Sequence, residues 1–219
     1  MNGAMLLVPI SSDEAARLEL QLFDKGPHMH QGRAERFIRL VFVFHPLKGA
    51  VASKRRKTLS VVAGCSDGRV LVYSSTERNA FEVCRDMGEV TSVASSPDGR
   101  TIAIVTYNHL LFFFIVETNT LSQGIDLGES FMNEMTYAQE GETVAVASED
   151  GSIRLVDVAS QKLLRTVRLM HGGAASVAFA PSGGVVVAGS SFGHLCFVNV
   201  GSGDVICQAR LDDMYNMYM

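Results

Sequence analysis

One turn recurs along this chain at a fixed spacing, and that spacing limits what the chain can fold into. Gly99, Gly141 and Gly183 are evenly spaced, because 141 minus 99 equals 183 minus 141. The segments that lead into the first and third of these glycines, 92–99 and 176–183, are similar in sequence. A second marker keeps the same phase, because Gly193 follows Gly151 at the same interval. Two markers in phase predict a fold built from repeated units.

Each repeat contains short apolar runs separated by turn residues, with almost no helical periodicity. In the clearest copy we expect four strands, at 132–138, 143–148, 152–157 and 163–169. Asp150-Gly151 predicts a hairpin turn between the second and third of them, because this pair favours positive φ. A unit of four strands in about 40–45 residues is typical of a propeller blade. The sequence therefore predicts an all-β propeller.

Four repeats can be placed on the chain, starting near Phe37, Val90, Met132 and Ala174. We expect a strand and loop at 1–36 that belong to a preceding or closing blade, then four blades, then a short tail. The blades span about 37–87, 88–130, 131–172 and 173–212, and the tail is 213–219. The first repeat is longer than the others because 47–57 is inserted in a turn. The Met- and Tyr-rich tail suits a strand added to an exposed edge or the start of another blade.

At these turns the chain resembles the WD-repeat family of β-propellers over about residues 37–212. The resemblance is carried by the Pro97-Asp98-Gly99 turn, the Asp67-Gly68 and Asp150-Gly151 hairpins, Val156-Asp157 in place of the family's Trp-Asp, and His171 in place of its Gly-His. It implies a ring of about six to eight blades, which needs roughly 300 residues. Four blades do not make that ring, so we expect an incomplete or open propeller.

The family holds each blade with a hydrogen-bonded tetrad of Asp, His, Ser or Thr, and Trp, and this chain has no tryptophan. Ser148 with Asp150 is half a tetrad in one blade, and His171 with Ser190 is another half in the last. The resemblance implies structural and not catalytic roles for a set of blade positions, namely Asp67, Gly68, Ser148, Asp150, Gly151, Asp157, His171 and Ser190.

The amino-acid composition bears on the cellular compartment of the chain and on the partners it can bind. Its 219 residues are 47% hydrophobic with a net charge of -4, which gives a core and no general attraction to phosphate backbones. The apolar run 110–116 is too short to span a membrane and indicates a buried strand. The four cysteines, Cys65, Cys84, Cys196 and Cys207, lie in apolar runs without metal-binding spacing, so we expect buried, reduced thiols. An intracellular location, in cytoplasm or nucleus, follows as an expectation.

The sequence contains no clear motif for catalysis or for binding a metal or cofactor. We interpret His28 and His30 as surface side chains, and no nucleophile elbow, phosphate-binding loop or zinc-protease motif is present, so we expect no enzyme, metal or cofactor. The run Lys54-Arg55-Arg56-Lys57 is either a solvated loop or a docking site for nucleic acid, an acidic protein or an import receptor.

The function expected from the resemblance is a protein-interaction scaffold, a subunit or adaptor of a larger complex. Its partners would be other proteins, among them a chain or segment that completes the propeller, and would meet residues beside the hairpin turns: Tyr107, Glu149 and Phe192. The alternatives are an RNA-processing or ribosome-assembly component that uses 54–57 and a propeller-based enzyme.

Overall fold

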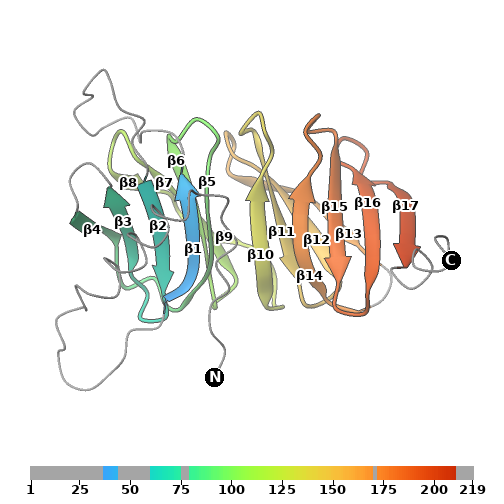
Figure 1. Cartoon of the computed structure of the whole chain (residues 1–219), viewed down its shortest axis with the longest axis horizontal. Coiled ribbons are helices and arrows are strands. Elements are labelled where there is room, and N and C mark those ends of the chain that lie inside the picture. Colours follow the sequence, from blue (N-terminus) through green and yellow to red (C-terminus); the bar gives the residue numbers. More distant parts are fainter. Residues whose placement is uncertain (1–36, 44–59, 75–78, 170–171, 211–219) are drawn as a thin grey trace, which may run out of the picture.

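The computed structural model describes residues 37–43, 60–74, 79–169 and 172–210. Within these ranges every regular element is a β-strand. The strands form four antiparallel sheets that follow one another along the chain (Figure 1). Each sheet is one blade, so the described chain is all-β and has the form of an incomplete β-propeller, as the sequence predicts. No described segment is a helix of the length and apolarity that crossing a membrane requires.

The strands of each blade are hydrogen-bonded in chain order. Blade 1 contains β1 (Phe37–Val43), β2 (Ser60–Cys65), β3 (Val70–Ser74) and β4 (Asn79–Cys84). Blade 2 contains β5 (Val90–Ser95), β6 (Thr101–Thr106), β7 (Leu110–Ile115) and two short strands that both pair with β7, β8 (Thr120–Leu121) and β9 (Ile125–Asp126). Blade 3 contains β10 (Met132–Tyr137), β11 (Thr143–Ser148), β12 (Ser152–Asp157) and β13 (Lys162–Arg168). Blade 4 contains β14 (Ala174–Phe179), β15 (Val185–Ser190), β16 (His194–Asn199) and β17 (Val205–Arg210).

The first strands begin at the four residues that the sequence repeat indicates, and the strands of blade 3 lie within one residue of the predicted ranges. The run 110–116 contains a strand, β7, as predicted. Several predictions fall outside the described residues: the loop with His28 and His30, the inserted basic loop, His171 and the tail after residue 210.

Each blade carries a bulge at the same place. In blade 2 the register between the first and second strands shifts between Val90 and Ser92. The same shift occurs at the start of the first strand in blades 1, 3 and 4. A bulge of this kind bends the strand and increases its twist. The four sheets are therefore repeats in backbone geometry as well as in sequence.

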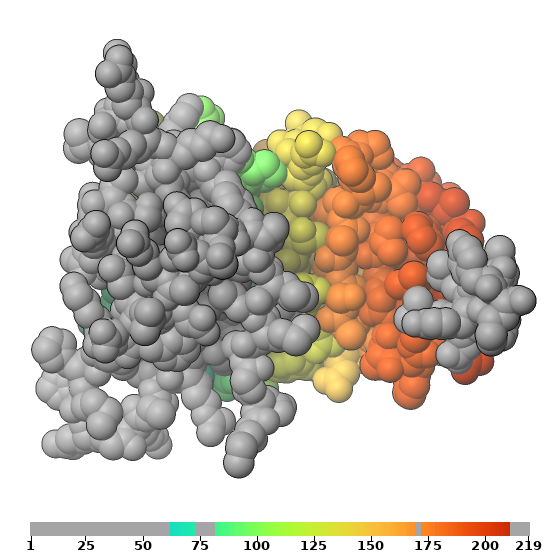
Figure 2. All heavy atoms as spheres, in the orientation of Figure 1, coloured from blue at the N-terminus to red at the C-terminus, as the bar shows by residue number. Residues whose placement is uncertain are grey.

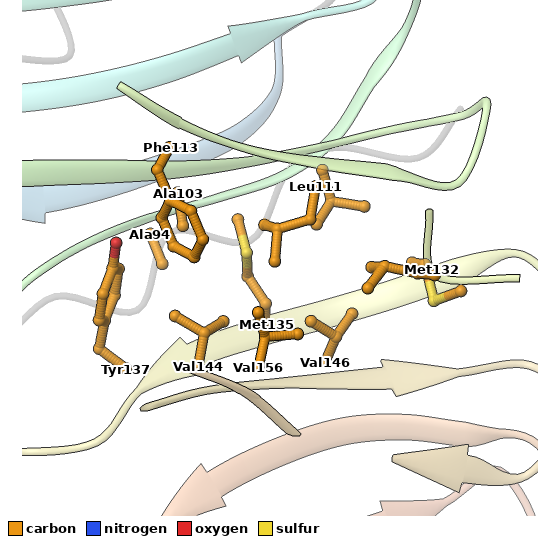
Figure 3. Close-up of a cluster of buried hydrophobic side chains, with 12 residues drawn as sticks. Ala94, Ala103, Leu111, Phe113, Met132, Met135, Tyr137, Val144, Val146 and Val156 are labelled. Carbon is orange, nitrogen blue, oxygen red and sulfur yellow. The ribbon is translucent and has the colours of Figure 1, made fainter. Parts of the chain in front are cut away.

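The core lies between neighbouring blades and forms three clusters, one at each blade-to-blade contact. Figure 3 shows the middle cluster, where Leu111 and Phe113 of blade 2 face Val144 and Val146 of blade 3. The intervening residues of β11, such as Ala145, face blade 4 instead. All four residues 144–147 are 0% exposed, so both faces of this strand are covered. Blades 3 and 4 lie side by side without a gap in the space-filling view (Figure 2).

Blade 4 is covered on one face by blade 3 and is more open on the other. In β15, Val186 and Ala188 are buried, whereas Val185 and Val187 are half-buried. Ala145, which lies one repeat before Val187, is fully buried against blade 4. This contrast is what an incomplete propeller gives, because the last described blade has a neighbour on one side only.

One prediction about the cysteines is wrong. Cys65, Cys84 and Cys196 are buried, but Cys207 is exposed. It lies on β17, the outermost strand of blade 4, where the apolar pattern continues although little packs over it. Burial, with a smaller contribution from Glu82, raises the pKa of Cys84 to about 11, which keeps that thiol protonated.

Candidate protein-interaction face

The turns between second and third strands lie beside the linkers that join the blades. The turns are 66–69, 107–109, 149–151 and 191–193, and the described linker segments are 85–89, 127–131 and 172–173. We call this surface the turn face. It contains the three residues that the sequence proposes as partner-binding outside the basic loop.

Each turn of blades 2, 3 and 4 is fastened to the linker that enters the same blade. One backbone N–H of the turn donates to a linker carbonyl in each case: Tyr107 to Glu89 at 2.7 Å, Glu149 to Phe131 at 2.9 Å and Ser191 to Gly173 at 3.0 Å. Successive donors are one repeat apart, and so are successive acceptors. The turn face is therefore held by a repeated backbone contact, which fixes the side chains that project from it.

The same position of every turn has a left-handed backbone. It is Gly68, His109, Gly151 and Gly193, with φ of 87°, 63°, 78° and 76°. At Gly151 there is also no room for a side chain, because a Cβ would lie 2.6 Å from the carbonyl oxygen of Gly172. The glycines proposed as structural residues thus lie where the backbone requires them.

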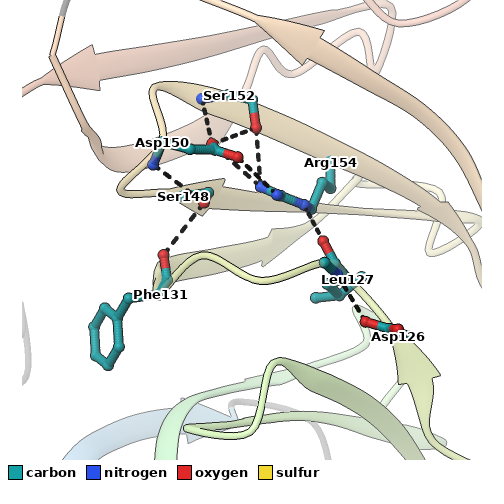
Figure 4. A network of polar contacts seen from close by, with 8 residues as sticks. Asp126, Leu127, Phe131, Ser148, Asp150, Ser152 and Arg154 are labelled. Carbon is teal, nitrogen blue, oxygen red and sulfur yellow. Dashed lines mark hydrogen bonds and ion pairs between the residues drawn. The ribbon is translucent and has the colours of Figure 1, made fainter.

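Asp150 lies at the centre of a polar network in blade 3 (Figure 4). Its carboxylate accepts from the backbone N–H and hydroxyl of Ser152, at 2.9 and 2.6 Å, and pairs with Nη2 of Arg154 at 2.9 Å. The Arg154 side chain is only 6% exposed, and its Nε donates to the carbonyl of Leu127 in the linker between blades 2 and 3. The network therefore ties the turn of blade 3 to the preceding linker.

The charge of Asp150 is stabilised by these contacts. Burial by itself would raise the pKa of this carboxyl group, but the hydrogen bonds from Arg154 and Ser152 outweigh burial and hold the pKa well below its usual range. Ser148, expected beside Asp150, accepts from the Asp150 backbone N–H at 3.4 Å and donates to the carbonyl of Phe131 at 3.3 Å. Ser148 thus supports the backbone of the turn and does not contact the carboxylate.

The other proposed blade positions have simpler surroundings. Asp67 pairs with Arg69 at 2.8 Å on a more exposed surface. Ser190 accepts from the backbone N–H groups of Phe192 and His194 at 3.2 and 3.1 Å, so a hydroxyl fixes this turn without an aspartate. Asp157 lies at the far end of β12 and accepts from the backbone N–H of Ser160 at 2.7 Å. Hydrogen bonds from the side chain and backbone of Ser160 lower the pKa of Asp157.

Aromatic side chains stand out from the turn face. Tyr107 is 55% exposed and Phe192 is 68% exposed, the latter being the most exposed large apolar side chain among the described residues. The Tyr107 ring meets Phe131 edge-on, with 5.8 Å between centroids, and stacks on His109 at 6.4 Å. The Phe192 ring lies over the backbone of Gly172, where a Cβ would be 2.0 Å from the ring. Glu149 is exposed between these groups.

The free charge on the turn face is mostly negative. Asp86, Glu89, Glu129 and Glu149 are exposed, and none of them has an ion pair within the described part of the chain. Three arginines of this face are each paired with a carboxylate: Arg69 with Asp67, Arg85 with Glu82 and Arg154 with Asp150. Arg168, the last residue of β13, is exposed at the outer margin.

Comparison with known proteins adds one likeness. Over 102 residues the chain is 31% identical to cleavage stimulation factor subunit 50 of Arabidopsis thaliana, a WD-repeat protein. The match covers 45% of this chain and 24% of that protein, so the chain spans about a quarter of its relative's length. No protein-family model matches the chain. The likeness supports a WD-repeat type of propeller.

Two residues of the turn face escape sequence reasoning. Arg154 lies among the apolar residues Ile153, Leu155 and Val156 of β12, and an arginine flanked by buried apolar side chains indicates a paired, buried charge. Phe131 lies one repeat after Glu89, so the spacing places it at the same linker position, but the two residues differ in type, one aromatic and one acidic.

Among the described residues, no three His, Cys, Asp or Glu side chains are grouped closely enough to hold a metal ion.

Proposed function

We propose that the chain is a non-enzymatic protein-interaction scaffold that works as a subunit or adaptor of a larger complex. The observation that carries this proposal is the exposure of Tyr107 and Phe192 on turns whose backbone is fixed. Exposed aromatic groups on a rigid surface are the residues that most often anchor protein partners. The relative's name, a subunit of a stimulation factor, supports a role inside an assembly.

The roles of individual residues form part of the proposal. Asp67, Gly68, Ser148, Asp150, Gly151, Asp157 and Ser190, with His171 outside the described residues, maintain the blades. Tyr107, Glu149 and Phe192 contact the partner. Fold alone does not determine function, so the proposal depends on this surface and not on the propeller as such.

The test is affinity purification with mass spectrometry from the native source. The variant Tyr107→Ser/Phe192→Ser removes both exposed aromatic side chains of the turn face. Its matched control is Leu163→Ser/Leu164→Ser on β13, where the leucines are 40% and 53% exposed but lie outside that face. Loss of partners with the first variant and retention with the control is expected. Equal capture by the two variants would refute the proposal.

A second candidate function is an RNA-processing role, and the likeness to a cleavage stimulation factor subunit favours it. It would use Lys54, Arg55, Arg56 and Lys57, which lie outside the described residues. Binding through four cations should weaken steeply as salt is raised. A salt-sensitive RNA pull-down that is abolished by changing all four to Ser would support this role. RNA capture that these substitutions leave unchanged would exclude binding through this loop, and no RNA capture by the unaltered chain would exclude the role.

A further inference from the structure

We propose that the turn face of blades 2 to 4 binds a cationic segment of the partner protein, one that carries Arg or Lys side chains. This inference rests on the proposed scaffold function and adds the chemistry of the partner. It is carried by three features: a continuous row of contacts across the blades, exposed aromatic rings at both ends of that row, and unpaired carboxylates beside it.

Contacts place the groups in one row across three blades. Tyr107 of blade 2 touches Phe131, whose carbonyl accepts from the backbone N–H of Glu149 in blade 3 at 2.9 Å. Glu149 in turn lies against Gly173, where a Cβ would be 3.2 Å from the Glu149 Cα. Phe192 of blade 4 rests on Gly172, the neighbouring residue of the same linker. The aromatic rings and the glutamate are therefore neighbours although they are far apart in sequence.

The two linker glycines keep the middle of the row accessible. The position of Gly173 is occupied by Phe131 one repeat earlier and by Glu89 one repeat before that, and all three carbonyls accept the same backbone bond. With glycine at 172 and 173, no side chain from these two residues stands between Glu149 and the Phe192 ring. A partner side chain can thus meet the ring and the carboxylate together.

The negative charge of the turn face favours a cationic partner. Glu89, Glu129 and Glu149 are exposed and have no ion pair among the described residues, whereas Arg69, Arg85 and Arg154 are already paired with carboxylates. An aromatic face attracts a cation through its ring quadrupole, and a nearby carboxylate adds a charge-assisted hydrogen bond. Arginine satisfies both, because its planar guanidinium stacks on a ring and forms a fork of donors. An acidic or purely apolar partner would leave these carboxylates unpaired or buried at a cost.

The experiment uses the full chain and three fluorescent nonapeptides, of alternating Arg and Ser, Glu and Ser, and Leu and Ser. Binding is followed by fluorescence anisotropy at low and physiological salt. We expect the arginine peptide to bind, its affinity to fall with salt, and the other two peptides to bind more weakly. Phe192→Ser should weaken the arginine peptide about tenfold, as expected for one good cation–π contact. Glu149→Gln should weaken it about threefold, the effect of one exposed charge.

Leu164→Ser, on an exposed leucine of β13, is the control and should leave the arginine peptide's affinity unchanged. Because Phe192 and Glu149 are exposed, these variants should melt at the wild-type temperature, and a melt verifies it. Equal binding of the acidic or apolar peptide, or an affinity that Phe192→Ser and Glu149→Gln leave unchanged, overturns the inference. Parallel affinity purification separates the two proposals. If partners are lost with Phe192→Ser but the arginine peptide does not bind, the partner chemistry is wrong and the scaffold function stands.

Discussion

The Asp150–Arg154 pair offers the sharpest test of how the turn face is held. Asp150→Asn removes the negative charge and leaves the buried Arg154 guanidinium without its counter-ion. Removing one partner of a buried pair costs about 3–5 kcal/mol. Asp150 is 26% exposed and Asn keeps an oxygen that accepts from Ser152, so we expect a loss at or just below the lower end of this range, about 2–3 kcal/mol of unfolding free energy.

Asp67→Asn is the matched control because Asp67 occupies the same turn position in blade 1 and also pairs with an arginine. The Asp67 side chain is 45% exposed and that of Arg69 is 27% exposed, so this pair contributes less than about 1 kcal/mol. Urea unfolding followed by circular dichroism measures both variants. Burial of Arg154 is what separates the two pairs. A loss for Asp150→Asn no larger than that for Asp67→Asn would therefore show that the buried pair does not stabilise the fold.

The same pair predicts a dependence on pH. The pKa of Asp150 is lower in the folded chain than in the unfolded chain, so its contribution to stability is complete above the unfolded value, about 4, and is lost as pH falls through the folded value. The stability difference between wild type and Asp150→Asn should therefore be constant from about pH 5 to 7 and shrink below about pH 4. A difference that grows on acidification would contradict the assignment.

Three further perturbations test the packing. Gly151→Ala should lower the free energy of unfolding in urea by about 2 kcal/mol or more, because its φ is 78° and a Cβ would lie 2.6 Å from a linker carbonyl oxygen. Gly184→Ala is the control: nothing lies within 4 Å of the added Cβ, so stability should change by less than about 0.5 kcal/mol. Leu155→Ala, at a fully buried site between blades 3 and 4, should cost about 2–5 kcal/mol, and no measurable loss would place this residue outside the core. Iodoacetamide should label Cys207 in the native chain and the three buried cysteines only after denaturation, and mass spectrometry reports the order.

The repeat in the sequence predicts much of the fold. Turn glycines at a fixed spacing mark where each blade begins, because positive φ and tight turns restrict the residue more than a strand does. This is why the starts at Val90, Met132 and Ala174 agree with the strands of the structure. The start at Phe37, which the insertion at 47–57 takes out of this spacing, is indicated by its apolar run and also agrees. The burial of 144–147 also follows from small apolar side chains that fit between two blades.

The remaining features depend on contacts that no local pattern encodes. The partner of Asp150 is Arg154 on the next strand, and the guanidinium also reaches Leu127 in the linker that precedes the blade. The exposure of Cys207 depends on which face of blade 4 is covered by another blade. An apolar run in the sequence does not indicate which face is covered. Phe131 becomes part of the turn face only because its linker passes beside the Tyr107 turn.

Hydrogen–deuterium exchange on the chain with and without its captured partner tests whether the partner binds the turn face. We expect the partner to slow exchange at 107–109, 127–131, 149–151 and 191–193, because these segments form the turn face. The turns at the opposite end of the blades, 97–99, 139–141 and 181–183, should exchange at the same rate in both samples. Protection confined to those opposite turns would show that the partner does not bind the turn face.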